Sequence, residues 1–405
     1  MYSIGVRLYA GALKIAQHFH PKAKAWVEGR KNWTDKLPEV TDRDVYWFHC
    51  ASLGEFDQGI PVMNYIREHI PNAYILTTFF SPSGMEHYHK RKHPSDFVCY
   101  IPVDTKKNAR KFAEHFKPKA TFFVKYEFWE NHINAVKAKG SKTYSISTLL
   151  RPKQHFFHPI FGKFTRNVLY AFDYFFVQNE ETKRLLNGIG IQQVMQTGDT
   201  RFDRVLENKK QLIPNETVID FVGDSTFTLI AGSVWKPDLE ALKETILTRK
   251  FEKVIIAPHQ IDEEMIAHIE QLFPNQTTRF TEYKGNENPI LILDTIGHLA
   301  SAYSYGNLAY VGGGFSGSLH NILEPAVFGL PVIFGPKHSK FPEASYFIQE
   351  GIGFSVANAQ ELGLIVDELS PEKVNQLKLK TAKLVEENAG AAEKIGSFVI
   401  SNLTL

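Results

Sequence analysis

The stretch "LAYVGGGFSGSLHNILEPAVFGLPVIFGP" (residues 308–336) contains one repeating unit of an α/β fold. A short apolar run leads into three glycines, a segment of helical character follows, and a second apolar run, "PVIFG", closes the stretch. Strand-like runs of this kind recur along the chain, each followed by a polar or helical segment. Such alternation predicts parallel sheets covered by helices.

The strand-like runs fall into two series, from "DVYWFHC" to "QVMQTG" and from "TLIAGSV" to "PVIFG". At 405 residues the chain is also too long for one hydrophobic core. We therefore expect two tandem Rossmann-like domains, an N-terminal one at residues 34–205 and a C-terminal one at residues 206–405. The last helix could pack back on the N-terminal domain.

The composition is that of an ordinary globular protein, with 43% apolar and 22% charged residues and a formal charge of +2. Nothing in it favours a nucleic-acid partner. Cys50 and Cys99 imply neither a disulfide framework nor a zinc site, and they fit a reducing compartment. The sequence shows neither a membrane-spanning apolar run nor a signal peptide, so we expect the protein to stay in the cytoplasm.

Residues 1–33 combine apolar residues at helical spacing with basic residues and a single acid, Glu28. The apolar residues are Ile4, Leu8, Ala12, Ile15 and Phe19, and the basic residues are Arg7, Lys14, Lys22, Lys24, Arg30 and Lys31. This pattern predicts a helix that lies in the plane of a membrane interface. A helix packed on its own domain fits the periodicity equally well.

Ligands of open α/β sheets bind at the carboxyl ends of the strands, so the glycine-rich loop is a candidate binding site. Its glycines are Gly312, Gly313 and Gly314. We expect a helix that starts near His320 and offers free N–H groups to a phosphate, with Asn321 and Glu324 on one face for phosphate or ribose. A plain glycine-rich turn before a capped helix is the alternative. The spacing differs from the dinucleotide and P-loop patterns.

Two further strand ends in the second series carry small or hydrogen-bonding residues. Gly232 and Ser233 lie in "AGSVWKP", and His259 lies in "APHQ". They could contact a nucleotide phosphate or base, although His259 could equally be a loop histidine with a structural role.

Glu55 and Glu127 are the acids at strand ends of the first series, in "HCASLGEF" (residues 49–56) and "FVKYEFWEN" (residues 123–131). Glu127 interrupts an aromatic run, where an unpaired carboxylate would be costly, so it has either a function or a partner such as Lys125 or Arg151. Glu55 opens a predicted helix, where an acid complements the helix dipole whether or not it is catalytic. We expect this first-turn position to favour the ionised carboxylate.

A basic segment, "HYHKRKH" (residues 87–93), lies between two predicted strands. It could hold anionic groups of an acceptor or a membrane surface, or it could be a solvated face.

Together these motifs resemble the lipid A Kdo transferases, a GT-B family that transfers 3-deoxy-D-manno-octulosonic acid (Kdo) from CMP-Kdo to a tetraacylated lipid A precursor. The resemblance covers nearly the whole chain, through "HCASLGEF", "KYEFWEN", "GDTRFD", "AGSVW" and "GGGFSGSLHNILEPAVFGLPVIFGP". It implies two Rossmann-like domains that face a central cleft. It also implies an amphipathic N-terminal helix on the cytoplasmic face of the bacterial inner membrane.

The resemblance also implies roles for single residues in an inverting transfer. Glu55 matches the general base and Glu127 a second important acid. The resemblance carries nucleotide contacts over to Ser233, His259, Gly313, Gly314, Asn321 and Glu324. Besides these, we expect Gly232 and Gly312 to bind the donor. We expect the acceptor to be bound by Ser52, Gly54, His87, Lys90, Arg91 and Lys92. No cofactor or metal is implied, since CMP is a monoester leaving group with less charge to neutralise.

The chain departs from the family pattern in several places. Lys125 and Glu130 replace the usual residues of their motif, no arginine accompanies His259, and the N-terminal segment is less apolar than the usual anchor. Another GT-B transferase or a sugar-nucleotide epimerase is the alternative enzyme. A two-domain sugar-binding protein is the non-enzyme alternative.

Overall fold

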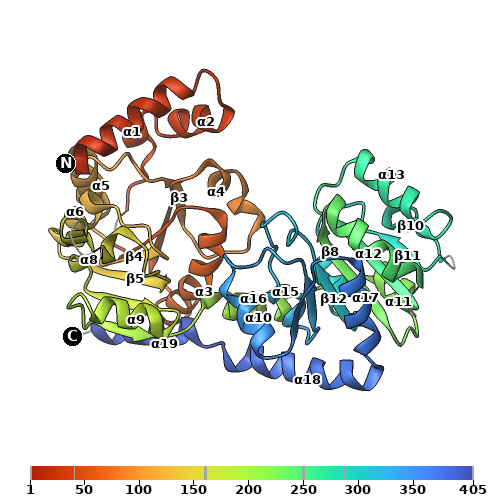
Figure 1. Ribbon diagram of the computed structural model, residues 1–405. Coiled ribbons are helices and arrows are strands. Elements are labelled where there is room, and N and C mark those ends of the chain that lie inside the picture. The colour runs from red at the N-terminus through yellow and green to blue at the C-terminus, as the bar shows by residue number, and fades with distance from the viewer. Residues whose placement is uncertain (1, 41, 159–161, 249–250, 286–287, 404–405) are drawn as a thin grey trace. The chain divides into compact units, whose positions relative to one another are not determined.

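The computed structural model describes residues 2–40, 42–158, 162–248, 251–285 and 288–403 (Figure 1). The chain forms two compact units: unit 1 comprises Met1–Arg204 with Asn388–Leu405, and unit 2 comprises Val205–Glu387. In the described residues each unit contains a seven-stranded sheet in which all neighbours are parallel. The expected α/β class is therefore confirmed.

The sheet of unit 1 has the order β3-β2-β1-β4-β5-β6-β7. Its strands are β1 (Val45–Cys50), β2 (Tyr74–Phe79), β3 (Phe97–Tyr100), β4 (Ala120–Val124), β5 (Lys142–Thr148), β6 (Tyr174–Val177) and β7 (Val194–Gln196). Successive strands are added on one side of β1 and then, from β4 onward, on the other. The topological switch point lies between β1 and β4, where ligands of such sheets bind.

Both faces of this sheet are covered, which explains the continuous apolar runs in the sequence. Every residue of β1 and β4 is buried. The helices of unit 1 are α1 (Tyr2–Ala16), α2 (Pro21–Gly29), α3 (Leu53–His69), α4 (Pro82–His87), α5 (Lys106–Phe116), α6 (Glu130–Lys137), α7 (Gly162–Thr165), α8 (Asn167–Tyr170), α9 (Glu180–Asn187) and α19 (Ala391–Leu403). Short 3₁₀ helices span Trp33–Lys36, Tyr88–Lys90 and His155–Phe157.

The sheet of unit 2 has the order β10-β11-β9-β8-β12-β13-β14. Its strands are β8 (Thr228–Val234), β9 (Lys253–Pro258), β10 (Thr277–Arg279), β11 (Ile290–Ile292), β12 (Leu308–Val311), β13 (Val332–Phe334) and β14 (Gly353–Ser355). The switch point of this sheet lies between β8 and β12. The glycine-rich loop and the "AGSVW" loop therefore leave neighbouring strands at that point.

Helices cover the second sheet as well. They are α11 (Glu216–Val222), α12 (Lys236–Thr248), α13 (Glu263–Leu272), α14 (Leu299–Tyr303), α15 (Leu323–Ala326), α16 (Pro342–Gln349), α17 (Ala359–Glu368) and α18 (Pro371–Glu387), with a 3₁₀ helix at Phe280–Glu282. The boundary between the two units falls within helix α10 (Thr200–Lys210), after Arg204. The prediction of a helix that starts near His320 is wrong, because α15 begins at Leu323 and has only four residues.

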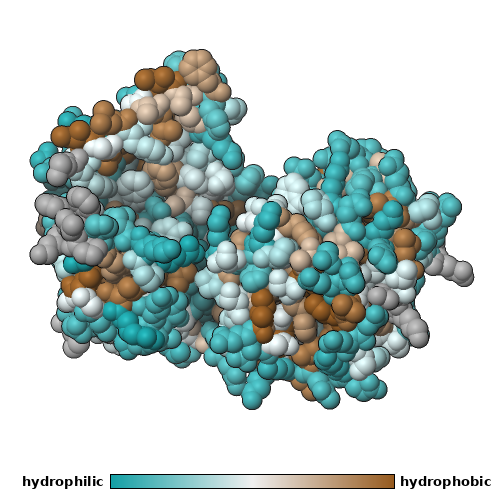
Figure 2. Space-filling view, viewed as in Figure 1, coloured by the Kyte–Doolittle hydropathy of each residue, from teal (hydrophilic) through white to brown (hydrophobic). Residues whose placement is uncertain are grey.

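The N-terminal segment forms α1 and α2, which lie on unit 1 (Figure 1). The outer side of α1 carries exposed apolar side chains, and apolar residues gather along it in Figure 2. Ile4 is 63% exposed, Leu8 70%, Ile15 69% and, just beyond the helix, Phe19 85%. Arg30, one of the basic residues of this segment, is buried, with 7% of the residue exposed. Within the described residues, every helix is too short or too polar to cross a membrane.

Candidate active site

Glu55 lies in the first turn of α3, directly after β1. The backbone N–H of Ser52 donates to Glu55 Oε2 at 3.0 Å, and the Ser52 side chain in turn accepts the N–H of Glu55. This reciprocal pair is a capping box, which satisfies two otherwise unpaired donors at the start of the helix. Glu55 is thus a helix-opening acid, whatever else it does.

Glu55 is buried, with only 6% of the residue exposed, and this burial has the largest effect on its pKa. Burial and the neighbouring Glu127 raise the pKa of Glu55 to about 7, against the opposing effects of Lys125 and nearby backbone N–H groups. The backbone N–H groups of the first turn favour the ionised form, as expected, but desolvation outweighs them and the pKa is raised. A carboxyl group with a pKa near neutrality is well matched to proton transfer.

Glu127 lies in the loop after β4, the strand beside β1 at the switch point. The indole N–H of Trp129 donates to Glu127 Oε2 at 3.0 Å and to Nε2 of the buried His49 at 2.9 Å. The two acceptor atoms are 3.8 Å apart. The sequence pattern did not suggest the pairing of Trp129 with His49, because these residues are 80 positions apart in the chain.

The loops at both switch points contain a non-glycine residue with positive φ. Lys125, after β4, has φ of 65°, and Ser233, at the end of β8, has φ of 54°. Such conformations are costly for residues with a side chain, and they cluster at functional sites. Lys125 also lowers the pKa of Glu55, which places a positive charge beside the two acids.

The residues expected to bind an acceptor lie on two segments of unit 1. Ser52 and Gly54 are at the start of α3, beside Glu55. The basic residues of the second segment are His87, Lys90, Arg91 and Lys92. Arg91 Nε donates to Asp57 Oδ1 of α3 at 3.0 Å, two residues beyond Glu55. His87, Lys90 and Lys92 are exposed, so this segment is a solvated basic face that is linked to α3.

In unit 2 the glycine-rich loop packs backbone against backbone. A Cβ atom on Gly312 would lie 2.2 Å from the carbonyl oxygen of Ser233, and one on Gly314 would lie 2.4 Å from the nitrogen of Gly335. The loop after β12 therefore touches the loops after β8 and β13 at positions where only glycine fits.

Two amide groups of this loop are already bonded within the protein. The N–H of Gly312 donates to the carbonyl of Gly232 at 2.9 Å, and that of Gly313 donates to Asp238 Oδ2 at 3.0 Å. The N–H groups of Gly312 and Gly313 are therefore engaged within the protein, and the expected role of the glycine loop in holding a phosphate stays a prediction. The side chains of Asn321 and Glu324 do lie together, with Asn321 Nδ2 donating to Glu324 Oε1 at 3.3 Å.

His259 belongs to a stack of three rings beside the same loop. Its ring stacks on Trp235 at 4.3 Å and on His320 at 4.4 Å between centroids. Trp235 Nε1 also donates to His320 Nε2 at 3.3 Å. Burial and the neighbouring His259 lower the pKa of His320 to about 4, so His320 is a neutral acceptor. Trp235 and His320 were missed from the sequence, although both flank predicted donor residues.

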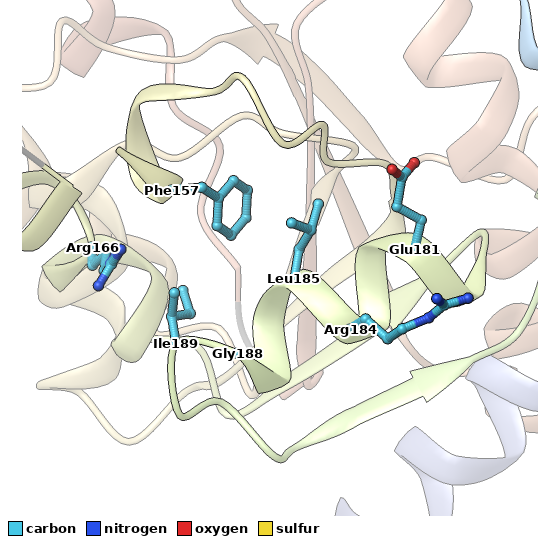
Figure 3. A pocket seen from close by; sticks show the side chains of 7 residues that line it. All are labelled: Phe157, Arg166, Glu181, Arg184, Leu185, Gly188 and Ile189. Atoms are coloured by element: carbon cyan, nitrogen blue, oxygen red, sulfur yellow. The ribbon is translucent and has the colours of Figure 1, made fainter. Parts of the chain in front are cut away.

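Unit 1 also contains a hollow of about 360 Å³ that none of the site residues described above lines. It is lined by Phe157, Arg166, Glu181, Arg184, Leu185, Gly188 and Ile189. Figure 3 shows Phe157 and Leu185 turned toward each other across it, whereas Arg184 extends away from them. None of the expected site residues lines it. Among the described residues, no group of three His, Cys, Asp or Glu side chains forms a metal site.

Comparison with solved structures supports the class of the fold. The UDP-GlcNAc 2-epimerase of Neisseria meningitidis, solved with UDP-GlcNAc bound, superposes with a TM-score of 0.61 over 89% of this chain and 99% of that one, at 16% identity. At this identity the likeness concerns the fold alone. The chain thus has a GT-B-like fold of two tandem parallel α/β units.

Sequence comparison finds similarity to one family of transferases. The family model of 3-deoxy-D-manno-octulosonic-acid transferase (kdotransferase) matches residues 24–204. The chain is 29% identical to the 3-deoxy-D-manno-octulosonic acid transferase of Aquifex aeolicus (strain VF5), over 80% of this chain and 85% of that one. It is 28% identical to the corresponding transferase of Chlamydophila psittaci, over 74% of this chain and 72% of that one. The chain is therefore similar to Kdo transferases over most of its length.

Proposed function

We propose that this chain transfers Kdo from CMP-Kdo to a hydroxyl group of the lipid A precursor lipid IVA, in lipopolysaccharide biosynthesis, with Glu55 as the general base. The observation that carries the proposal is the buried Glu55 carboxyl at the switch point of unit 1, with a pKa of about 7 and a second carboxylate, Glu127, beside it. A carboxyl group in this state can exchange a proton with a bound hydroxyl at neutral pH.

In the proposed reaction, ionised Glu55 removes the proton of the acceptor hydroxyl while that oxygen attacks the anomeric carbon of Kdo. The new C–O bond forms as the bond to the phosphate oxygen of CMP breaks, and CMP leaves with the electron pair. Attack opposite the leaving group inverts the anomeric configuration. Glu127, whose charge raises the pKa of Glu55, would keep the site negative where an oxocarbenium-like sugar develops positive charge.

Unit 2 supplies the proposed donor site. Ser233 lies at the end of β8, His259 follows the neighbouring β9, and Asn321 and Glu324 come after β12. The hydroxyl, ring, amide and carboxylate groups of these residues suit the sugar and base of a nucleotide. Gly232, Gly312 and Gly313 shape the loops through their backbone contacts. The amide of Gly314 and the Ser233 hydroxyl are then the candidates for contact with the phosphate.

Helix α1 is proposed to lie on the cytoplasmic face of the inner membrane, where the lipid acceptor resides. Ile4, Leu8 and Ile15 present an exposed apolar side in the orientation that an interfacial helix requires. The exposed Arg7 and Lys14 of the same helix add the positive charge that anionic lipid attracts.

The test is a Glu55→Gln variant assayed with CMP-Kdo and lipid IVA, with the product identified by mass spectrometry. We expect turnover to fall roughly 10²–10⁴-fold, the usual effect of removing a general base, while CMP still binds. Glu180→Gln is the matched control, because Glu180 is also a first-turn acid after a strand of the same sheet but is exposed. It should retain parental turnover.

Two outcomes would overturn the proposal at different levels. Turnover of Glu55→Gln within a few-fold of the parent would reject the base assignment alone. Absence of any Kdo-lipid product from the parent protein would reject the reaction and favour another GT-B transferase or an epimerase.

A further inference from the structure

We propose that Trp129 is a positioning residue for Glu127 and that helices α1 and α2 hold Trp129 in place. This inference rests on the proposed function, because it concerns the acid beside the proposed base. It is carried by one hydrogen-bond network and one column of aromatic rings, neither of which the transfer reaction itself requires.

The network starts at the indole N–H of Trp129, which is shared between Glu127 Oε2 at 3.0 Å and His49 Nε2 at 2.9 Å. An N–H can donate to Nε2 only if that nitrogen carries a lone pair, so the proton of the neutral His49 ring is on Nδ1. Nδ1 lies 2.9 Å from Thr78 Oγ1, which also accepts the indole N–H of Trp47 at 2.8 Å. The Trp129 N–H thus sets the tautomer of His49, and Thr78 Oγ1 can accept the Nδ1–H.

This network is rigid because β1 and β2 set its spacing. His49 and Thr78 are partners in the parallel register of these strands, and both are fully buried. Glu127, in contrast, belongs to a loop that begins with a strained Lys125. The shared indole N–H thus ties a carboxylate on a loop to a histidine on the central sheet.

The ring of Trp129 is held by a column of aromatic side chains. Trp129 stacks on Phe80 with centroids 4.8 Å apart, and Phe80 stacks in turn on Tyr9 of α1 at 6.2 Å. Trp26 of α2 meets Phe80 edge-on at 5.8 Å. Aromatic pairs of this geometry add to the stabilisation that comes from buried area. The column runs from the N-terminal helices to the acid pair.

Arg30, just after α2, fixes the middle of the column. Its guanidinium donates to the carbonyl groups of Phe80, Trp26 and Ile101 at 2.7, 3.1 and 2.9 Å, and it lies 4.0 Å from the ring centroid of Trp26. It has no carboxylate partner among the described residues. A buried arginine bonded to carbonyl groups fixes backbone and ring together.

The backbone that follows Trp129 is attached to α1 as well. The Tyr2 hydroxyl donates to Asp104 Oδ2 and accepts the N–H of Glu130 at 3.3 Å. Asp104 also accepts the N–H groups of Asn131 and His132 at 3.2 and 2.8 Å, in the first turn of α6. Both the ring and the backbone of Trp129 are thus connected to the N-terminal helix.

The decisive experiment compares Trp129→Phe with Trp47→Phe in the transfer assay. Both variants keep an aromatic ring and lose one indole N–H of the same network, but only Trp129 touches Glu127. We expect Trp129→Phe to lower kcat about 10-fold or more with the KM for CMP-Kdo unchanged. Trp47→Phe should keep kcat within about 3-fold even where it lowers the melting temperature. Equal kcat for the parent and Trp129→Phe would overturn the proposal.

A double-mutant cycle with Glu127→Gln separates positioning from general packing. If Trp129 acts through Glu127, adding Trp129→Phe to Glu127→Gln changes kcat by less than about 2-fold, whereas independent effects would multiply. Multiplied effects would overturn the proposal.

A third measurement does not depend on turnover, so it separates failure of this inference from failure of the proposed function. With 5-fluorotryptophan incorporated, the ¹⁹F resonance of Trp129 should shift in Glu127→Gln and in Tyr9→Ala, while that of Trp33 stays in place. An unmoved Trp129 resonance in both variants would overturn the proposed coupling even if Kdo transfer is confirmed.

Discussion

Glu55 combines two roles that the sequence presents as alternatives. The capping box ties one of its carboxylate oxygens to the Ser52 N–H, and this bond orients the group at the end of β1. Burial and Glu127 then make ionisation costly enough to bring the pKa to about 7. A helix cap therefore supplies the orientation of the proposed base, and desolvation supplies its basicity.

The raised pKa of Glu55 predicts a specific dependence of stability on pH. Because the folded state holds this proton more tightly than the unfolded chain, the associated stability is present below pH 4.5 and is lost as the pH rises through about 7. The shift corresponds to about 3 kcal/mol at most. Glu55→Gln cannot ionise, so we expect it to be more stable than the parent at pH 8 and nearly equal to it at pH 4.5.

Chemical denaturation at several pH values measures this effect. Glu180→Gln serves again as the exposed control and should show no pH-dependent gain. A difference between Glu55→Gln and the parent that stays constant from pH 4.5 to pH 8 would contradict the assignment of a raised pKa.

Among the elements, the glycine-rich loop depends on one buried carboxylate. Asp238, in the first turn of α12, accepts the N–H groups of Trp235 and Gly313 and the hydroxyl of Tyr310, at 2.9, 3.0 and 2.8 Å. It therefore joins the loop after β8 to the loop after β12. A residue 1% exposed with three donors around it tolerates no change in hydrogen-bonding character.

Asp238→Asn should destabilise unit 2 by roughly 1–2 kcal/mol, because the bonds from the two N–H groups to a charged oxygen weaken and the Tyr310 hydroxyl must turn to accept from the amide NH₂. CMP affinity, measured by calorimetry, should fall along with it. Asp262→Asn is the matched control: Asp262 caps α13 through the N–H of Met265, and asparagine caps equally well there. Equal stability of the two variants would show that Asp238 does not organise the loops.

The sequence predicted the elements better than their contacts. The strands were visible because burial on both faces leaves apolar runs, and the residues after them were correctly expected at strand ends. The helix near His320 was wrong because the apolar spacing after the glycines looks helical, while the backbone there turns and bonds within the loop. The burial of Arg30 and the pairing of His49 with Trp129 depend on contacts between distant segments, which no local pattern shows.

At the scale of the whole chain, the last helix belongs to the first unit. Ala392, Ile395 and Val399 of α19 are buried in the same apolar cluster as residues of α3 and β1. Asp203 accepts the N–H of Gly390 at 2.8 Å and so fixes the entry to this helix. The chain therefore returns to complete the core of unit 1.

Replacing Ile395 and Val399 with serine should destabilise unit 1 by several kcal/mol, because two buried side chains are lost and polar groups replace them. Limited proteolysis should then cleave unit 1 first, while CMP binding by unit 2 persists. The control replaces Glu393 and Lys394, on the exposed side of α19, with serine. Cleavage that begins in unit 2 would contradict this account.

The outer side of α1 yields the last prediction, which concerns the molecule and its surroundings. Replacing Ile4, Leu8 and Ile15 with serine removes three apolar side chains that are each more than 60% exposed. Full burial of one such side chain contributes about 1.5–3 kcal/mol, so even partial insertion of three predicts a loss of about 100-fold in membrane partitioning. Co-sedimentation with vesicles of phosphatidylethanolamine and phosphatidylglycerol measures this loss of partitioning.

The control variant replaces three exposed apolar residues of unit 2 with serine. These are Ile213, Ile296 and Leu379, which are 82%, 85% and 76% exposed. If both triple variants partition like the parent, α1 does not bind the membrane; if both lose binding equally, general apolar exposure rather than the α1 face is responsible.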